Sequence, residues 1–431
     1  MSKNDKELND ILGAYAVGGL SRRQALRALG VGGLATLGAA AWPLIGRQAF
    51  ADEAGKQAGP GGIPLARPNK PVKLPLYADP IKSGMKPESG TFKIFSYQDY
   101  VDQKVMDSFA KKYDVKVEIT TFSSMDQAVT RMATGQVKPD ATSMTPDRMA
   151  QIVAGKLIQP INHDYIPNLK ANIWPTLQSP FYDVDSQYSV PYVVYSTGIG
   201  WRSDKVSEDI HKLDNPWSIF WNAEKYSGYV GVLDDSRETL ALGMMYKGEY
   251  DINSEDPQVL EASLEELKKM IKICHPKVDT KEYQQLGDAT SWLHHSWSGD
   301  LLSCSFSYLA KGTDPNVLQY RDGGRGKTPV ENDNWVLLAK SEKPVLGHLW
   351  LNHLLDEKVA YDNFTGFTGY QPPQNNIKAE DMIKQGLIPE SLRTAILTAD
   401  DLGPDSIDHC QLTPTGQKLW QATYAKFLSG V

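Results

Sequence analysis

The feature that most constrains the fold is an alternation between strand-like and helix-like patterns that begins at Thr91. Residues 92–95 and 115–119 have the composition and spacing of strands, and an apolar helical stripe lies between them. A second helical stripe covers residues 125–132. Strands that alternate with helices predict an α/β fold with a mainly parallel sheet. With 431 residues, the chain is long enough for two such domains.

The first 51 residues have the pattern of an export signal. Arg22 and Arg23 are paired arginines, residues 28–45 form a Gly/Ala-rich apolar run, and residues 49–51 read Ala-Phe-Ala. We therefore expect residues 1–51 to be a twin-arginine signal peptide, cleaved after Ala51, that sends the protein to the periplasm through the twin-arginine machinery. The alternative is a single membrane anchor, and the glycines and Pro43 argue against it.

The next segment, residues 52–90, holds seven prolines and six glycines and has no sustained apolar period. This composition predicts a linker or an extended arm that lies on the surface. The folded body is expected to start where the first strand pattern begins, at Thr91.

The formal net charge of −7 limits the classes of partner. Because six basic and three acidic residues lie in the predicted signal, the rest of the chain is more acidic still. This balance argues against nucleic acid and anionic membranes and favours a cationic ligand. The three cysteines, Cys274, Cys304 and Cys410, permit one disulfide at most and exclude a scaffold built from disulfides.

An acidic stretch stands where a core strand is expected to end. The apolar residues 229–233 are followed by Asp234, Asp235 and Glu238, and then by an apolar helical pattern. Ligands of open α/β sheets bind beyond the carboxyl ends of strands, so this is a place for a site. Asp235 and Glu238 also have the spacing of a capping box, N-cap to N3, which offers a purely structural explanation.

Two chemical alternatives for this stretch have weaker support. A metal site needs convergent ligands, and the chain has no H-x-x-x-H or C-x-x-C spacing, so we expect no metal. A nucleophile motif of the G-x-S-x-G kind is also absent from the sequence. A carboxylate pair for glycoside cleavage stays open, because the separation it requires is spatial. The two main interpretations of the acidic stretch are helix capping and a cation-binding site, and the two are compatible.

Five segments carry a resemblance to a known family. They occur in the following order: FSYQDYVD (95–102), YSVPYVVYSTGIGW (188–201), LDDSRE (233–238), HSWSGD (295–300) and GYQPP (369–373). As an ordered set over residues 91–431, they resemble the periplasmic spermidine/putrescine-binding proteins of ABC importers. The resemblance implies a two-lobed, hinged periplasmic-binding-protein fold, with a mainly parallel sheet flanked by helices in each lobe. The first lobe would hold residues 91–199 and 334–371, and the second would hold residues 200–333 and 372–431.

The resemblance also implies a function. The protein would be a monomer without catalysis or cofactor that traps a small organic cation between its lobes and delivers it to a membrane permease. Rings and carboxylates suit this task, because an ammonium gains from a ring face and from charge-assisted hydrogen bonds once water is excluded. The residues that match the family's ligand contacts, directly or by position, are Tyr97, Tyr100, Thr145, Asp147, Asp235, Glu238, Trp297, Glu331, Asp333, Tyr370 and Gln411.

The chain departs from the family pattern at three of these places. Glu331 stands where relatives have an aromatic residue, Thr145-Pro146-Asp147 replaces a Ser-x-Tyr pair, and Tyr97 replaces a tryptophan. We therefore expect a site that is less aromatic and more acidic, for a cation with more or differently spaced positive groups, or with hydroxyls. The rival interpretations are an exported hydrolase or lyase on a similar fold, and a binding protein for a metal, an anion or another small solute.

Overall fold

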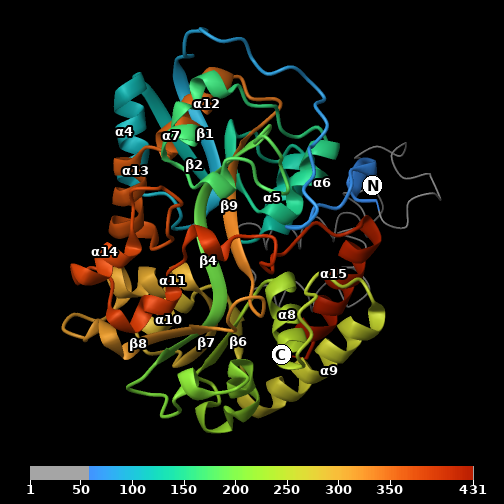
Figure 1. Cartoon of the computed structure of the whole chain (residues 1–431), viewed down its shortest axis with the longest axis vertical. Coiled ribbons are helices and arrows are strands. Elements are labelled where there is room, and N and C mark those ends of the chain that lie inside the picture. The colour runs from blue at the N-terminus through green and yellow to red at the C-terminus, as the bar shows by residue number, and fades with distance from the viewer. Residues whose placement is uncertain (1–57, 431) are drawn as a thin grey trace, which may run out of the picture.

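The strands of the molecule form one continuous sheet that runs through both of its halves (Figure 1). The computed structural model describes residues 58–430, and the nine strands of this part follow the order β2-β1-β3-β9-β4-β7-β5-β6, with β8 paired to β4. Their bounds are β1 Gly90–Tyr97, β2 Val115–Phe122, β3 Ala141–Met144, β4 Ser189–Arg202, β5 Val230–Leu233, β6 Lys277–Asp279, β7 Leu293–Trp297, β8 Leu318–Asp322 and β9 Val330–Leu337.

The α/β prediction is confirmed, and the sheet as a whole is mixed. Strands β2, β1 and β3 are parallel to one another in the first lobe, and β6, β5 and β7 are parallel in the second lobe. Strands β4 and β9 are antiparallel to each other and to their other neighbours. Because β4 pairs with β9 through its first half and with β7 and β8 through its second, it joins the two lobes.

Helices cover both faces of each lobe's sheet (Figure 1). In the first lobe, the core under α4 and α12 is separate from the core under α5 and α6. In the second lobe, α8, α9 and α15 enclose one core and α10, α11 and α14 enclose the other. The helices are α4 Gln103–Tyr113, α5 Met125–Ala133, α6 Met149–Ala154, α7 Pro167–Asn172, α8 Ser236–Tyr246, α9 Pro257–Cys274, α10 Glu282–Gly287, α11 Ser298–Ser303, α12 Pro344–Leu354, α13 Glu357–Asn363, α14 Ala379–Lys384 and α15 Pro414–Leu428.

Strand β4 is buried along its entire length. A strand with neighbours on both edges and cores on both faces has no solvent-facing side, so its sequence is largely apolar rather than alternating. Pro191 lies within it, and the register with β9 shifts between Pro191 and Val193. A bulge is one of the places where a strand tolerates proline.

The Pro/Gly-rich segment is described from Ala58 onwards and packs on the first lobe. Ile63, Val72 and Leu74 are buried in the core under α5 and α6. The backbone N–H of Val72 donates to the carbonyl oxygen of Phe181 at 2.7 Å. Apolar residues spaced between the prolines thus attach this arm to the body.

Several sequence predictions are not tested by this part of the chain. The predicted signal, residues 1–51, lies outside the described residues, and the exact lobe boundaries stay a prediction. No helix of residues 58–430 has the length and apolar character needed to cross a membrane. The three cysteines are free and buried, so the disulfide that the sequence permitted is not formed.

Gly369, just before Tyr370, lies very close to the backbone of Ser303 in α11 of the second lobe. Its φ is +69°, and a Cβ atom there would lie 2.2 Å from the backbone nitrogen of Ser303 and 2.5 Å from its Cα. A side chain would therefore meet both backbone strain and a clash with backbone atoms.

We expect Gly369→Ala to lower the free energy of unfolding by about 2–4 kcal/mol, because neither the turn nor α11 can move away cheaply. Gly403→Ala is the matched control, since a Cβ there meets nothing within 4 Å. Chemical denaturation of both variants measures the difference. Equal stability of the two would contradict the close approach.

Candidate functional site

The site lies where the carboxyl ends of β1 and β3 in the first lobe face those of β5 and β7 in the second. Tyr97 and Trp297 are the last residues of β1 and β7, Asp147 and Asp235 follow β3 and β5 within a few residues, and β4 and β9 pass between them. Tyr97 shows how close the segments come: burial raises the pKa of its hydroxyl, and the nearby charges of Asp333, Asp235 and Asp147 raise it further. The two lobes therefore contribute to one shared cluster.

Asp333 is held by neutral donors. The Tyr100 hydroxyl donates to Oδ2 at 2.6 Å, and the Tyr195 hydroxyl donates to Oδ1 at 3.2 Å. Burial raises the pKa of Asp333 to about 7, and the neighbouring Glu331 adds to the shift. A carboxylate in this setting is short of positive charge.

The run of residues 331–334, Glu-Asn-Asp-Asn, has a composition typical of a turn, but the structure makes it part of β9. Along a strand, alternate side chains point to opposite faces. On one face, the Tyr182 hydroxyl donates to Asn334 Oδ1 at 2.8 Å and accepts from Asn332 Nδ2 at 2.7 Å. The other face carries Glu331 and Asp333 into the site.

The three carboxylates of the acidic stretch have separate roles. Asp234 accepts a hydrogen bond from Tyr424 of α15 at 2.7 Å. Asp235 is the N-cap of α8, and its Oδ1 accepts from the backbone N–H groups of Arg237 at 2.7 Å and Glu238 at 3.2 Å. Capping by Asp235 is as expected. The Glu238 side chain, however, turns into the site, so only half of the predicted capping box forms.

Glu238 is the second buried carboxylate of the site that neutral donors hold. Its Oε1 accepts from the Thr197 hydroxyl at 2.8 Å and from the Trp297 indole N–H at 2.7 Å, while its buried Oε2 has no hydrogen-bond partner. Burial raises the pKa of Glu238 to about 7. Glu238 and Trp297, each predicted from the sequence as a ligand contact, are thus in direct contact with each other.

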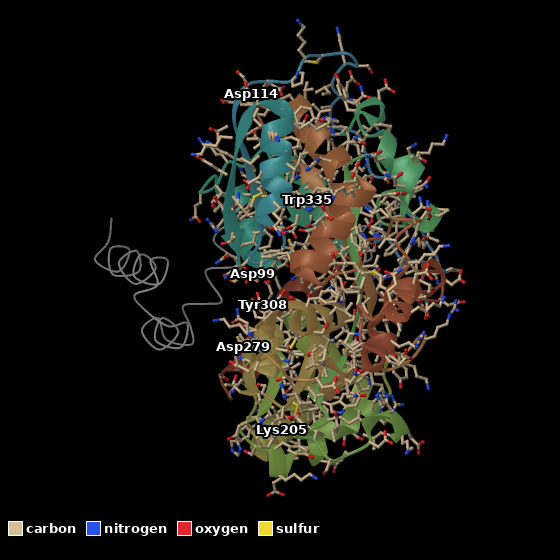
Figure 2. All side chains as sticks on the ribbon, turned by 90° about the vertical axis from the view of Figure 1, so that its left-hand side faces the viewer. Asp99, Asp114, Lys205, Asp279, Tyr308 and Trp335 are labelled. Carbon is tan, nitrogen blue, oxygen red and sulfur yellow. The ribbon has the colours of Figure 1, made fainter. Side chains whose placement is uncertain are left out.

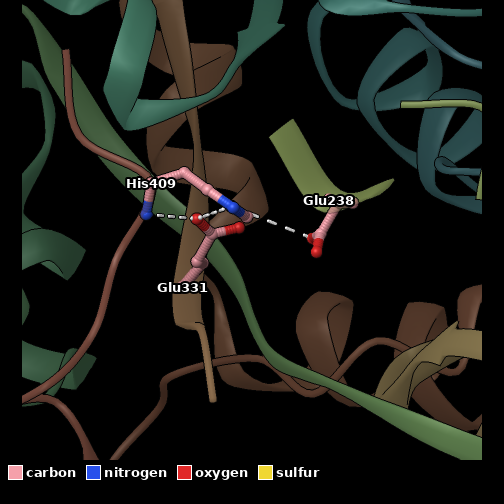
Figure 3. A group of neighbouring side chains, drawn as sticks. All are labelled: Glu238, Glu331 and His409. Atoms are coloured by element: carbon pink, nitrogen blue, oxygen red, sulfur yellow. Dashed lines mark hydrogen bonds and ion pairs between the residues drawn. The ribbon is translucent and has the colours of Figure 1, made fainter. Parts of the chain in front are cut away.

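Glu331 is neutralised by a residue that the sequence did not indicate (Figure 3). Its Oε1 accepts from the backbone N–H of His409 at 2.7 Å and lies 2.8 Å from His409 Nδ1. Burial alone would lower the pKa of His409, but Glu331 and Glu238 outweigh it and raise the pKa. Burial alone would likewise raise the pKa of Glu331, and His409 brings it below its usual value. The pair is therefore an ion pair.

Asp147 is also compensated. Its Oδ1 accepts from the Thr145 hydroxyl at 2.6 Å, and its Oδ2 lies 3.3 Å from Arg148 Nε and 3.9 Å from Arg237 Nη1. Arg237 stacks on the Trp420 ring with its guanidinium carbon 4.6 Å from the centroid. Two of the extra carboxylates that distinguish this sequence, Glu331 and Asp147, thus bring their own cations. The extra carboxylates are therefore present at the site, but their ion pairs offset their negative charge.

Aromatic rings connect Asp333 to Glu238. Tyr100 packs edge-on against Tyr97 at 5.7 Å and against Tyr370 at 5.6 Å between ring centroids. Tyr370 packs against Tyr195 at 5.6 Å, and Tyr195 lies 6.4 Å from Trp297. Tyr195 stands in register opposite Glu331, and sequence reasoning missed it because it reads as one more apolar residue of β4.

Three further residues lie at the border of the site. The Gln411 side chain accepts from the backbone N–H of Gln151 and donates to the carbonyl of Leu412, so these bonds do not join it to the cluster. Asp99 accepts from the Tyr283 hydroxyl at 3.2 Å, and Figure 2 shows it beside Tyr308 at the junction of the lobes. Asp300 is buried, and burial raises its pKa to about 6.

One group of the site has the residue types of a metal centre. Single ligand atoms of Glu238, Glu331 and His409 all lie within 4.8 Å of one another. These three residues could hold a divalent ion, since imidazole and carboxylate are common ligands. The Oε1 atom of Glu331 already takes part in two contacts with His409, which is the geometry of an ion pair.

The fold and the site together define a class of protein: a two-lobed α/β protein that encloses carboxylates and rings at the junction of its lobes. The model of the family "Bacterial extracellular solute-binding protein" matches residues 104–389, which is more than half of the chain. The chain therefore belongs to this family of bacterial extracellular solute-binding proteins.

Curated relatives and solved structures agree with this assignment. The putrescine/agmatine-binding protein of Pseudomonas aeruginosa is 24% identical over 307 residues, which cover 68% of this chain and 80% of that protein. The spermidine/putrescine-binding periplasmic protein of Escherichia coli is 26% identical over 187 residues, and this match spans 43% of the chain and 51% of that protein. A Listeria monocytogenes structure, provisionally described as a spermidine/putrescine ABC transporter, is similar with a TM-score of 0.66 and 20% identity, covering 79% of this chain and 99% of that one.

The raised pKa of Asp333 makes a prediction about stability. Its pKa in the folded protein is about 7 against an ordinary value of 3.8, so ionising it opposes folding as the pH rises between these values. We expect Asp333→Asn to gain stability relative to the ligand-free wild type by about 2 kcal/mol or more between pH 4 and pH 8, since one pKa unit corresponds to about 1.4 kcal/mol.

Urea denaturation of both proteins at several pH values measures this gain. Asp214→Asn, a change at an exposed aspartate, is the control and should show no such trend. A constant difference between Asp333→Asn and the wild type across this range would contradict the assigned environment of Asp333.

Proposed function

We propose that this protein is the substrate-binding component of an ABC importer and that it captures a small organic cation of the polyamine type. The observation that supports the proposal most directly is that Glu238 and Asp333 are buried without a cationic hydrogen-bond donor from the described residues. Both carboxylates are buried, and the hydrogen bonds they accept come from neutral hydroxyl and indole donors. Burying such charge is unfavourable until a cation compensates it, and an ammonium group can do so.

The rings between these carboxylates support the same ligand class. Tyr100, Tyr195, Tyr370 and Trp297 form a continuous set of contacts between Asp333 and Glu238. An aliphatic chain that carries ammonium groups gains from burial against such rings, and its charges gain from the ring faces. Two of the relatives are named as binding proteins for putrescine and agmatine and for spermidine and putrescine, which is consistent with this choice.

The export route in this proposal comes from the paired arginines of the N-terminal sequence, and the other features come from the class of protein. The protein would be exported by the twin-arginine route, work in the periplasm as a monomer, and deliver its ligand to a membrane permease. It would have no catalytic role and need no cofactor. The predicted ligand contacts would be Tyr97, Tyr100, Thr145, Asp147, Asp235, Glu238, Trp297, Glu331, Asp333, Tyr370 and Gln411, with Glu238 and Asp333 binding the amino groups.

Calorimetric titration with 1,4-diaminobutane tests this proposal. We expect the wild type to bind the diamine and the double variant Glu238→Gln/Asp333→Asn to bind it at least about 100-fold more weakly, because both anionic contacts are removed without a change in size. Asp214→Asn is the control and should bind as the wild type does.

Three other outcomes would contradict the proposal. Binding by the double variant within about threefold of the wild type would contradict the site. Tight binding of zinc ion in place of any amine would favour the metal-binding alternative at Glu238, Glu331 and His409. Turnover of a glycoside or ester by the purified protein would favour the hydrolase or lyase alternative.

A further inference from the structure

The balance of charge at the site distinguishes compensated carboxylates from uncompensated ones. Five of the predicted ligand contacts are acidic: Asp147, Asp235, Glu238, Glu331 and Asp333. Asp147 forms ion pairs with Arg148 and Arg237, and Asp235 is engaged as the N-cap of α8, where the positive end of the helix offsets its charge. Of the other three, Glu331 has a buried cation in direct contact with it.

His409 is the cation that compensates Glu331, and it is shared unequally. Its Nδ1 lies 2.8 Å from Glu331 Oε1 and 3.9 Å from Glu238 Oε1. One positive charge, on His409, is therefore near two glutamates. It pairs mainly with Glu331, because that contact is shorter and the backbone N–H of His409 also donates to Glu331. Glu238 and Asp333 are left with one negative charge each.

We propose that His409 sets the number of positive charges on the guest: by neutralising Glu331, it leaves two carboxylates that need a cation, so the site selects a dication over a trication. The inference rests on the proposed function, since it concerns the same site. It also narrows the expectation from the sequence, where Glu331, Asp147 and Tyr97 together suggested a cation with more or differently spaced positive groups, or with hydroxyls. His409 acts here as a specificity-determining residue.

The surroundings of His409 agree with this role. The charged and titratable groups that interact with it from other elements are Glu331 on β9, Glu238 and Arg237 on α8, Asp235 at the N-cap of α8, and His295 on β7. Its Nε2 is buried without a hydrogen-bond partner, so no other group holds the ring in place through that atom. Asp408 is also buried but is not one of the predicted ligand contacts; burial, Glu331 and Asp147 raise its pKa, and Arg237 opposes this shift.

Two variants change the charge in opposite directions. His409→Gln removes the cation, so Glu331 becomes a third uncompensated carboxylate, and the site should accept a triamine more readily. Glu331→Gln removes the anion, so the imidazolium is left beside Glu238 and should weaken amine binding. The double variant Glu331→Gln/His409→Gln removes both charges and should restore the wild-type preference.

The experiment is a calorimetric titration of each protein with 1,4-diaminobutane and with spermidine, which carry two and three ammonium groups. We expect the wild type to prefer the diamine. We expect His409→Gln to shift the ratio of the two dissociation constants toward spermidine by about tenfold or more, and Glu331→Gln to weaken diamine binding by about tenfold. The double variant should return to within about threefold of the wild-type ratio.

The control is His211→Gln, since His211 is an exposed histidine that contacts Trp201 in the second lobe. It should leave the ratio unchanged. If His409→Gln does not fold, as judged by its thermal melt, the double variant carries the test: a ratio that stays far from the wild-type value contradicts the inference.

The outcomes separate this inference from the proposed function. A wild-type protein that binds neither amine contradicts the proposed function itself. A wild type that binds amines, together with a folded His409→Gln of unchanged ratio, contradicts the role of His409 alone. Losses that simply add in the double variant would show that Glu331 and His409 have only a structural role.

Discussion

The structure depends on carboxyl groups that are buried at the junction of the lobes and that no external cation compensates in the ligand-free protein. Asp333 and Glu238 are each under a tenth exposed and are held by hydroxyl and indole donors. Burial raises the pKa of both carboxyl groups to about 7, which expresses how poorly these donors replace water around an anion. A guest with positive charge would relieve this penalty, so the same feature that disfavours the empty site favours ligand binding.

The two connecting strands make this arrangement possible. Strand β4 belongs to both lobes, and β9 runs antiparallel to it with Tyr195 opposite Glu331 and Val193 opposite Asp333. A strand presents every second side chain to the same face, so Glu331 and Asp333 enter the site together while Asn332 and Asn334 are bound by Tyr182 on the other face. The register between two strands, rather than a flexible loop, positions the acidic centre of the site.

The site also contains its own neutralising partners. Glu331 and His409, and Asp147 with Arg148 and Arg237, are ion pairs inside the cluster. Removing one partner of a buried pair leaves an uncompensated charge, which is more damaging than replacing both. The net charge of this site therefore depends on which residues form ion pairs. A count of acidic residues along the chain overestimates the negative charge that is available to a ligand.

The sequence by itself determined the elements and most of the members of the site. The alternating patterns after Thr91 and the capping signal at Asp235 depend on neighbours within a few residues, which a sequence displays directly. The ordered family segments pointed to Glu238 and Trp297, and Asp333 matched the family by its position. Only the tertiary structure decided which charges cancel. His409 lies 78 residues from Glu331 along the chain, and Arg237 lies 90 residues from Asp147, so neither pair leaves a local pattern. Residues 331–334 show the same limit: their Asp and Asn residues locally favour a turn, but pairing with β4 makes them part of β9.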